Sequence, residues 1–160
     1  MDMLVNLYAL PEETAVEGVR IMRVLPPDGK KVLDWVGAVF SEGWVSECTA
    51  ALCQQPPTCF IAQRDGAIIG FACYDATARG YFGPIGVAED ERGGGIGRAL
   101  LIRCLHGMRE AGYGYAVIGW CDEAQGFYRG AVGAIPIPDS APGQTAYSRM
   151  TRFSRKDAKA

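Results

Sequence analysis

The glycine-rich hexapeptide Arg92-Gly93-Gly94-Gly95-Ile96-Gly97 constrains this chain more than any other stretch of its sequence. An apolar run over 81–87 precedes it, and an apolar, helix-forming run over 98–108 follows it. The hexapeptide is therefore predicted to be a turn between a strand and a helix. Such a turn directs several backbone N–H groups and the positive end of the helix dipole at one point, which suits a phosphate or pyrophosphate. Glycine allows this close approach because a Cβ atom would block it and would disfavour positive φ.

Two well-known phosphate-binding loops do not fit the hexapeptide. The P-loop ends in Gly-Lys-Ser/Thr, but Arg98 and Ala99 follow Gly97 here. The dinucleotide-binding loop needs a third glycine where this chain has Arg98 or Leu100. A glycine turn that merely caps a helix remains the plain structural alternative.

The remaining pattern, Arg-x-x-Gly-x-Gly, resembles the pyrophosphate loop of the GNAT family of N-acetyltransferases, which bind acetyl-CoA. Val87 stands five residues before Arg92, and this spacing matches the end of the family's fourth strand. The segment 124–128 resembles the short helix that carries the family's tyrosine, here Tyr128. The resemblance covers residues 58–135 strongly and the rest of the chain loosely.

Hydrophobic periodicity gives an order of elements that fits this family. Two strands are expected at 4–10 and 19–25, around a turn at 12–18, before helices at 30–40 and 45–54. Asp65-Gly66 predicts a tight hairpin, which would join strands at 58–64 and 67–75.

The second half of the chain completes this order. Strands are expected at 81–87, 115–121, 134–137 and 147–153, and helices at 97–108 and 124–128. The resemblance implies an α/β fold of the α+β type, the GNAT acyl-CoA N-acyltransferase fold. In it a mixed central sheet of about seven strands is flanked by about four helices.

Length and charge limit the classes of function. At 160 residues the chain is expected to form a single domain over 1–160. Its net charge of −2 predicts neither a nucleic-acid partner nor an anionic membrane, since both call for a basic face. The sequence shows no secretory signal pattern and no apolar stretch of membrane-spanning length. A cytoplasmic location is therefore expected.

The six cysteines lie at 48, 53, 59, 73, 104 and 121, and none forms a Cys-x-x-Cys pair. Free, buried thiols are expected in a reducing cytoplasm. His106 is the only histidine and is expected at the surface or its boundary. No metal site is predicted, because zinc would need to rest almost wholly on cysteines whose spacing is wrong for it.

The resemblance implies roles for particular residues. Amides of the hexapeptide would hold the pyrophosphate of acetyl-CoA, and Arg92 and Arg98 could add charged contacts. The strand end at 86–88 would pair with the pantetheine arm, and an amide near Val87 would face the thioester oxygen. The expected cofactor-binding residues are Gly86, Val87, Ala88, Arg92, Gly93, Gly94, Gly95, Ile96, Gly97, Arg98 and Phe127.

Tyr128 is the expected catalytic residue, acting as general acid. A tyrosine pKa of about 10 lies above a thiol pKa of about 8.5, so the hydroxyl is protonated at neutral pH and can donate. The alternative is that the ring simply packs in the core. Two departures from the family pattern bear on this: Gly133 comes one residue late after Tyr128, and Glu89 stands where members often have proline.

The acceptor side is less determined. Glu42, Glu47, Asp75 and Glu89 are candidate bases, and water is another. The segments 40–47 and 138–147 are expected to line the acceptor pocket, with Trp44 and Tyr147 as aromatic candidates for which ordinary packing is the stronger interpretation. The mixed charges do not identify the amine.

The sequence therefore predicts an N-acetyltransferase that moves the acetyl group of acetyl-CoA to a primary amine, in a small molecule, by direct transfer. A covalent route would need an activated thiol, and Cys121 is the cysteine expected nearest the site. The alternatives are a non-catalytic acyl-CoA-binding or regulatory module and a protein or peptide N-terminal acetyltransferase. A nucleotide-binding domain is a weaker alternative, and a homodimer stays open.

Overall fold

The computed structural model describes residues 1–151, which form a seven-stranded mixed sheet with four α-helices. The strands are β1 (Met3–Asn6), β2 (Arg20–Arg23), β3 (Cys59–Arg64), β4 (Ala67–Tyr74), β5 (Tyr81–Val87), β6 (Tyr115–Ile118) and β7 (Ile135–Pro136). The helices are α1 (Gly29–Val39), α2 (Glu42–Leu52), α3 (Ile96–Glu110) and α4 (Gln125–Val132). None of these helices has both the length and the apolar character needed to cross a membrane.

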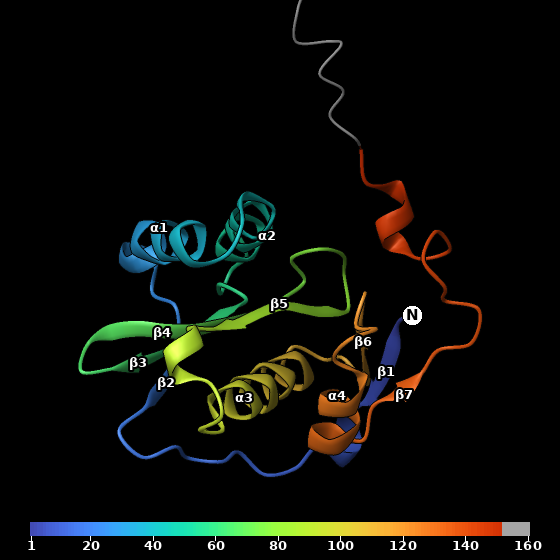
Figure 1. Cartoon of the computed structure of the whole chain (residues 1–160), viewed down its shortest axis with the longest axis horizontal. Coiled ribbons are helices and arrows are strands. Elements are labelled where there is room, and N and C mark those ends of the chain that lie inside the picture. The colour runs from blue at the N-terminus through green and yellow to red at the C-terminus, as the bar shows by residue number, and fades with distance from the viewer. Residues whose placement is uncertain (152–160) are drawn as a thin grey trace, which may run out of the picture.

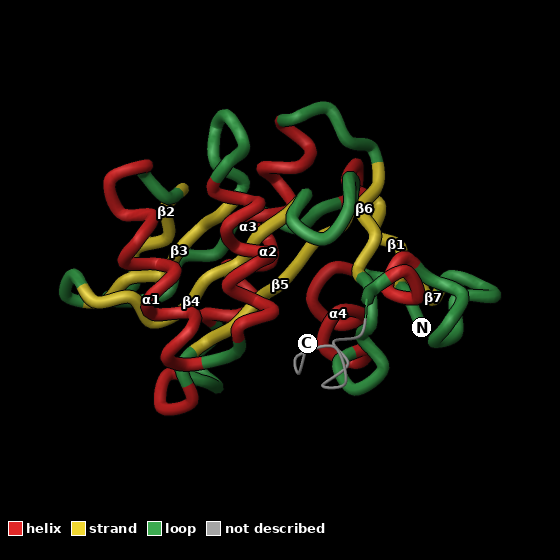
Figure 2. Tube along the Cα trace, turned by 90° about the horizontal axis from the view of Figure 1, so that it is seen from above, coloured by secondary structure: helices red, strands yellow, loops and turns green. Residues whose placement is uncertain are grey.

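The sheet separates two helical layers. Figure 1 shows α1 and α2 on one face of the sheet and α3 and α4 on the other. Seen from above, α1 and α2 cover the β3–β5 half, while α4 lies beside β6, β1 and β7 (Figure 2). Each layer buries its own core: Phe60 and Leu100 belong to the α3 side, and Ile61 and Phe71 to the α1–α2 side. Neighbouring residues of β3 point to opposite faces, as the strand period requires.

The predicted hairpin at Asp65-Gly66 is confirmed. Both residues have positive φ, +50° and +81°, as the tight two-residue hairpin turn requires. The pairing begins at Arg64↔Ala67 and Gln63↔Ile68, and then shifts to Ala62↔Gly70. One extra residue, Ile69, therefore sits in β4 as a bulge.

The predicted start of the chain is corrected. The strand expected at 4–10 ends at Asn6, and Leu7–Ala9 form a 3-10 helix. β1 and β2 are not neighbours, because the strand order is β2-β3-β4-β5-β6-β1-β7. The connection over 10–19 crosses the outside of α3 (Figure 1), where Glu13 contacts Arg103 at 3.8 Å and the Pro11 carbonyl lies 2.9 Å from His106. Local periodicity identifies a strand but not its partner.

The predicted last strand at 147–153 is also wrong over its described part. Ala146–Arg149 form a short 3-10 helix, and residues beyond 151 lie outside the described region. The sheet edge of β6 is already taken by β1, which pairs antiparallel with both β6 and β7. Met3 and Val5 of β1 have no exposed surface, so the N-terminal segment fills an interior position of the sheet.

Candidate active site

The candidate site is an opening between β5 and β6. These parallel strands pair only at Tyr81↔Val117 and Phe82↔Ile118. On its other side β5 remains paired with β4 as far as Val87. One edge of β5 beyond Phe82 is therefore unpaired, and it offers free backbone groups to a ligand.

The open edge of β5 presents amides in a regular order. Ala88 N–H donates to the Ile69 carbonyl of β4 at 2.9 Å. Because successive residues of an antiparallel pair point alternately toward and away from the partner, the Val87 and Ile85 amides face the opening. Arg92 Nε donates to the Val87 carbonyl at 3.1 Å on this side. The prediction for Val87 fits this geometry, and Ile85 is an addition that sequence reasoning missed.

The glycine turn has the predicted form. Gly93 and Gly95 have φ of +86° and +84°, a region that favours glycine. No side chain caps the start of α3, so the N–H groups of its first turn have no side-chain partner. Gly93 and Gly94 have no heavy atom within 4 Å of the position of an added Cβ. The buried Ile96 holds the exposed turn to the core.

A salt bridge holds the segment that leads into the glycine turn. Glu91 ends a 3-10 helix, Glu89–Glu91, that leads into the turn. Arg64 of β3 donates to the Glu91 carboxylate at 3.1 Å, and this carboxylate raises the pKa of Arg64. The pair ties the turn to the β3–β4 hairpin.

Gly97 lies between Val87 of β5 and Phe127 of α4. An added Cβ would lie 3.7 Å from Val87 Cγ2 and 3.9 Å from Phe127 Cζ. The φ of Gly97 is not positive, so the backbone conformation at this position does not require glycine. Gly95 differs, because its φ is positive. Because Gly97 has no side chain, it leaves space beside the Phe127 ring. Phe127 is 41% exposed.

Two arginines line a cavity of about 600 Å³ next to α4. Arg98, in the first turn of α3, donates to Thr14 Oγ1 at 3.2 Å. Arg129 of α4 lines the same cavity and was not predicted. Both guanidinium groups are positively charged, so the cavity favours an anionic group.

Gly86 has a different role from the one expected. Gly86 is buried, and an added Cβ would overlap the Phe40 ring. Phe40 lies in the short connection between α1 and α2. The position that a Gly86 side chain would occupy therefore faces the α1–α2 layer, where the Phe40 ring fills it. Trp44 packs in the same layer, 4.9 Å from the Phe40 ring and 5.8 Å from the Phe71 ring. The packing interpretation of Trp44 is thereby confirmed.

Tyr128 lies at the opening, on α4. Its side chain is 7% exposed, and its ring packs 6.3 Å from Phe82 and 5.1 Å from Phe127. Burial raises the pKa of Tyr128 to about 12, with smaller contributions from the neighbouring Cys121 and Tyr147. The late Gly133 has a simple cause: α4 continues to Val132, and Gly133, at φ +66°, is its left-handed C-cap.

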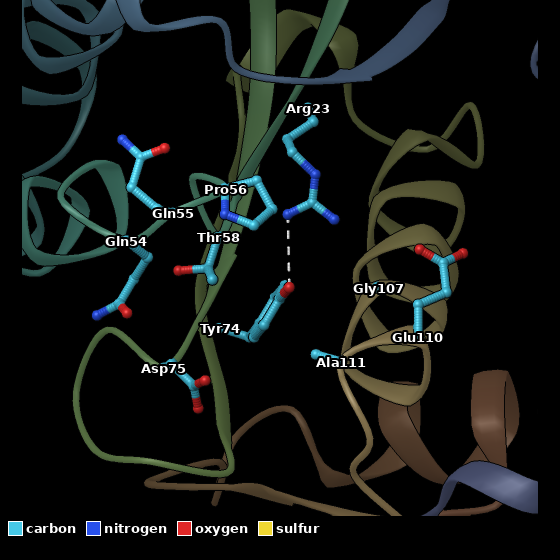
Figure 3. Close-up of a pocket in the computed structure, with 10 residues that line it drawn as sticks. All are labelled: Arg23, Gln54, Gln55, Pro56, Thr58, Tyr74, Asp75, Gly107, Glu110 and Ala111. Atoms are coloured by element: carbon cyan, nitrogen blue, oxygen red, sulfur yellow. Dashed lines mark hydrogen bonds between the residues drawn. The ribbon is translucent and has the colours of Figure 1, made fainter.

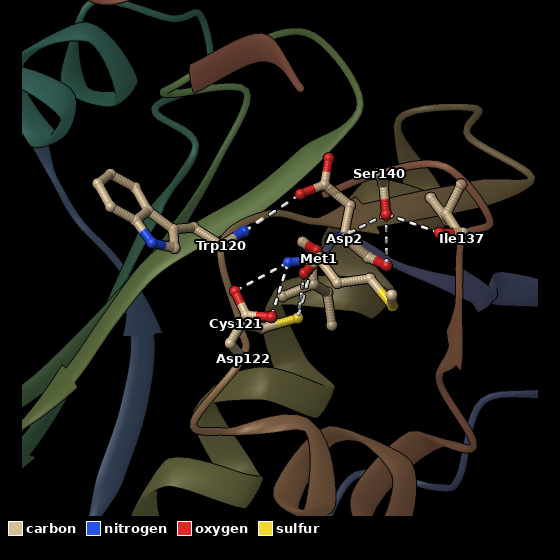
Figure 4. A network of polar contacts seen from close by, with 8 residues as sticks. Met1, Asp2, Trp120, Cys121, Asp122, Ile137 and Ser140 are labelled. Atoms are coloured by element: carbon tan, nitrogen blue, oxygen red, sulfur yellow. Dashed lines mark hydrogen bonds and ion pairs between the residues drawn. The ribbon is translucent and has the colours of Figure 1, made fainter. Parts of the chain in front are cut away.

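Cys121 and Trp120 follow β6 at the same opening (Figure 4). The Cys121 thiol donates to the Met1 carbonyl at 3.3 Å, and burial raises its pKa. Trp120 has an unusual positive φ of +52° and is 66% exposed. Its amide donates to the buried Asp2 carboxylate at 3.2 Å. This contact holds a strained backbone with an aromatic ring at the rim of the site.

The segment 146–149 covers the end of β6. Its Tyr147 lies over Gly119 and packs 5.3 Å from Trp120. On α2, the Glu47 carboxylate accepts a hydrogen bond from the Thr77 hydroxyl, and both groups influence the pKa of Tyr147, which burial raises. Of the four candidate bases, Glu47 is the one that reaches this group.

The other candidate bases lie elsewhere. Asp75 accepts from the Tyr113 hydroxyl at 2.8 Å and lines a pocket of about 390 Å³ with Glu110 and Arg23 (Figure 3). That pocket adjoins the end of α3 opposite the glycine turn, and fifteen residues of helix span about 22 Å. Glu42 and Glu89 are exposed on the surface.

The six thiols are free, five of them buried and Cys53 exposed. Sequence reasoning missed that Cys48, Cys59 and Cys73 lie together in the α1–α2 layer. No spacing motif marks this cluster, since its members come from a helix and two strands.

Comparison with known proteins gives a family and a fold. The profile of the family described as "Acetyltransferase (GNAT) family" matches residues 29–133. No curated protein matches the chain.

Solved structures resemble the chain at low sequence identity. A GCN5-related N-acetyltransferase from Sphaerobacter thermophilus is 24% identical, with a TM-score of 0.66 over 84% of this chain and 47% of that one. A GCN5-related N-acetyltransferase from Kribbella flavida is 17% identical, with a TM-score of 0.60 over 84% of this chain and 53% of that one.

A third resemblance is to a region, described as a glucosamine N-acetyltransferase, of a fungal multi-domain β-N-acetylglucosaminidase. It is 16% identical, with a TM-score of 0.68 over 84% of this chain and 19% of that one. The chain thus spans about half of each bacterial protein and a smaller part of the fungal one. At these identities the resemblances show the fold alone.

Proposed function

Because the chain belongs to the acetyltransferase (GNAT) family, we propose that it transfers the acetyl group of acetyl-CoA directly to a primary amine of a small-molecule acceptor. The observation that carries the proposal is the unpaired edge of β5, which leads to the glycine turn at one end and adjoins Tyr128 at the other. Acetyl-CoA supplies an activated thioester. The residues of the chain bind it, orient it and move protons.

The binding residues fit an extended ligand that ends in phosphates. The amides of the glycine turn and the first turn of α3 receive the pyrophosphate. The expected role of Ala88 is not kept, because its N–H already donates to Ile69 of β4. The pantetheine arm pairs instead with the β5 edge at Ile85 and Val87, beside Gly97 and Phe127. Arg98 and Arg129 are available to a further phosphate at their shared cavity. A β5 amide, Ile85 or Val87, faces the thioester oxygen and polarises it.

Tyr128 is proposed to protonate the departing thiolate. With a pKa near 12 its hydroxyl is fully protonated at neutral pH. The same dry surroundings also raise the pKa of a thiolate that leaves beside it. The difference between the pKa of Tyr128 and the pKa of the departing thiol is therefore smaller than it would be if the thiol left in water.

Glu47 is proposed to assist the amine. Its carboxylate sits on the α2 side with Thr77 and Tyr147, opposite α4. A carboxylate there attracts an ammonium group and can take its proton, so that the neutral amine attacks. Trp120 supplies a ring against which the acceptor can lie.

Two observations favour direct transfer to a small acceptor. Cys121 is a poor nucleophile, because its thiol is buried and its pKa is raised. The segment 146–149 lies over the end of β6 through the Tyr147–Gly119 contact, which narrows the space for a peptide. This argues against the peptide acetyltransferase alternative.

The test combines binding and turnover on one preparation. Calorimetry with CoA should detect a single site, and acetyl-CoA consumption should rise with at least one member of a panel of polyamines, amino acids, aminoglycosides and peptide N-termini. Binding without turnover on any amine would favour the acyl-CoA-binding module. Turnover on peptides alone would favour the peptide alternative.

Gly97→Glu tests the binding mode. The carboxylate of the new glutamate would lie between Val87 and Phe127 and would repel the phosphates of CoA. The affinity for CoA should therefore fall at least tenfold, about 1.4 kcal/mol. Gly97→Ala is the matched control, since an added Cβ makes only ordinary contacts there and should leave folding intact. Equal CoA affinity in folded Gly97→Glu would remove the cofactor assignment.

A further inference from the structure

Three cysteine side chains meet in the core between α2 and the β3–β4 hairpin. Cys48 comes from α2, Cys59 from β3 and Cys73 from β4, and none has exposed surface. The three Sγ atoms lie within 4.8 Å of one another, and those of Cys48 and Cys59 are 3.9 Å apart. Within residues 1–151 no fourth cysteine, histidine or carboxylate joins this group.

The bulge in β4 brings two of the three together. A regular hairpin from Arg64↔Ala67 would place Ala72 opposite Cys59. Because Ile69 is an extra residue, the register shifts by one, and Cys73 stands directly opposite Cys59. Both side chains then point to the α1–α2 face, where Cys48 faces them.

The spacing of the sulfurs suits a three-coordinate ion. With a metal–sulfur distance of about 2.3 Å, an ion at the centre of three sulfurs sets them about 4.0 Å apart. The Cys48–Cys59 separation already has this length, and the other two separations are at most 4.8 Å. Zinc takes four ligands in structural sites, whereas this site has three sulfurs among apolar neighbours such as Val32, Val36 and Phe71.

We propose that Cys48, Cys59 and Cys73 form a binding site for one soft, thiophilic metal ion, with Cu(I) as the ion that fits three sulfurs and no other donor. Soft thiolates select Cu(I) over the harder divalent ions. Each sulfur that binds as a thiolate releases one proton, and no electron is transferred. The site lies apart from the β5–β6 opening and does not depend on the proposed transferase activity.

A bound ion would join α2 to the sheet. Cys48 follows Glu47 in α2, and the two strands that carry Cys59 and Cys73 lead to β5 through β4. Occupancy should therefore raise the thermal stability of the chain and hold Glu47 against Thr77. Full burial means that the ion enters during folding or when α2 opens.

The test uses the full chain, reduced and kept without oxygen. Titration with Cu(I) against a competing chelator such as bicinchoninate should give one Cu(I) per chain, and native mass spectrometry should show the same stoichiometry. Cys48→Ala should weaken binding at least a hundredfold. Cys104→Ala is the matched control, because Cys104 is equally buried but belongs to the core on the α3 face; it should bind as the wild type does.

X-ray absorption on the wild-type Cu(I) form gives a measurement that needs no variant. Three sulfur neighbours and no nitrogen or oxygen are expected. A wild type that does not retain Cu(I) against the chelator, equal affinity in Cys48→Ala, or a two-sulfur site would overturn the proposal. Tighter binding of Zn(II) in a parallel titration would overturn the choice of Cu(I).

Discussion

Tyr128 is the residue at which catalysis and packing can be separated. In the proposed mechanism its hydroxyl acts only when the thiolate departs, whereas its ring packs on Phe82 and Phe127 whether or not a ligand is bound. Tyr128→Phe keeps the ring, so the dissociation constant of CoA should change little. If the hydroxyl is the acid, kcat should fall by about 10²–10⁴-fold. Both values should be measured on one preparation, and near-wild-type kcat would assign the proton to water or another group.

The raised pKa of Tyr128 also has consequences for pH. An acid with a pKa of about 12 stays protonated where an ordinary tyrosine ionises, so the rate should not decline through loss of this proton between pH 8 and about 10.5. The folded chain holds the proton more tightly than the unfolded one. The protonated Tyr128 hydroxyl therefore contributes up to about 2–3 kcal/mol to the free energy of unfolding. This contribution is complete below about pH 10 and is lost as the pH rises toward 12.

Two measurements check this pH behaviour. The logarithm of kcat should be plotted against pH for the wild type, and unfolding free energies should be compared for the wild type and Tyr128→Phe between pH 9 and 11.5. The stability gap between the two proteins should narrow as pH rises. A gap independent of pH would mean that Tyr128 titrates normally.

At the scale of elements, Phe40 and Gly86 couple the α1–α2 layer to β5. In Gly86→Ala the new Cβ would overlap the Phe40 ring, and overpacking of this kind costs about 1–3 kcal/mol. Phe40→Leu should restore part of the lost stability when combined with it, because the smaller side chain makes room. Urea unfolding of both single variants and the double variant measures the coupling. Additive effects would show that the two residues do not share one space.

The elements that local chemistry determines were predictable from the sequence. The glycine turn, the Asp65-Gly66 hairpin and the helix after Gly95 follow from residues within a few positions of one another. The bulge at Ile69 was not predictable, because it depends on which strand faces meet the two helical layers. The Cys59–Cys73 pair was missed for that reason, since a regular hairpin would not align the two residues.

At the scale of the molecule, the two ends of the described chain meet at the site. β1 lies between β6 and β7, and the 146–149 segment covers the end of β6. Sequence patterns near the glycine turn predicted the proposed cofactor side, because one continuous segment builds it. The proposed acceptor side joins Glu47, Thr77, Trp120 and Tyr147 from distant segments, so no local motif could reveal it.

Asp2 ties these distant segments together. Its buried carboxylate accepts from the Trp120 amide at 3.2 Å, and its own amide donates to Ser140 Oγ at 2.9 Å (Figure 4). The carboxylate also accepts from the Tyr81 hydroxyl at 3.3 Å. Asp2→Ala leaves two part-buried donors, the Trp120 amide and the Tyr81 hydroxyl, without this partner. The loss of a partner costs about 1–3 kcal/mol for a buried group.

The comparison for Asp2→Ala is Asp34→Ala. Asp34 pairs with Lys30 on the exposed face of α1 at 2.6 Å, and such surface pairs contribute about 0.2–1 kcal/mol. Urea unfolding should therefore show a larger loss in Asp2→Ala. Because the strained Trp120 backbone loses its acceptor, the KM for the amine should also rise, with CoA affinity unchanged. Equal losses in the two variants, with an unaltered KM, would mean that the Asp2 contacts neither hold β1 to β6 nor position the rim of the acceptor site.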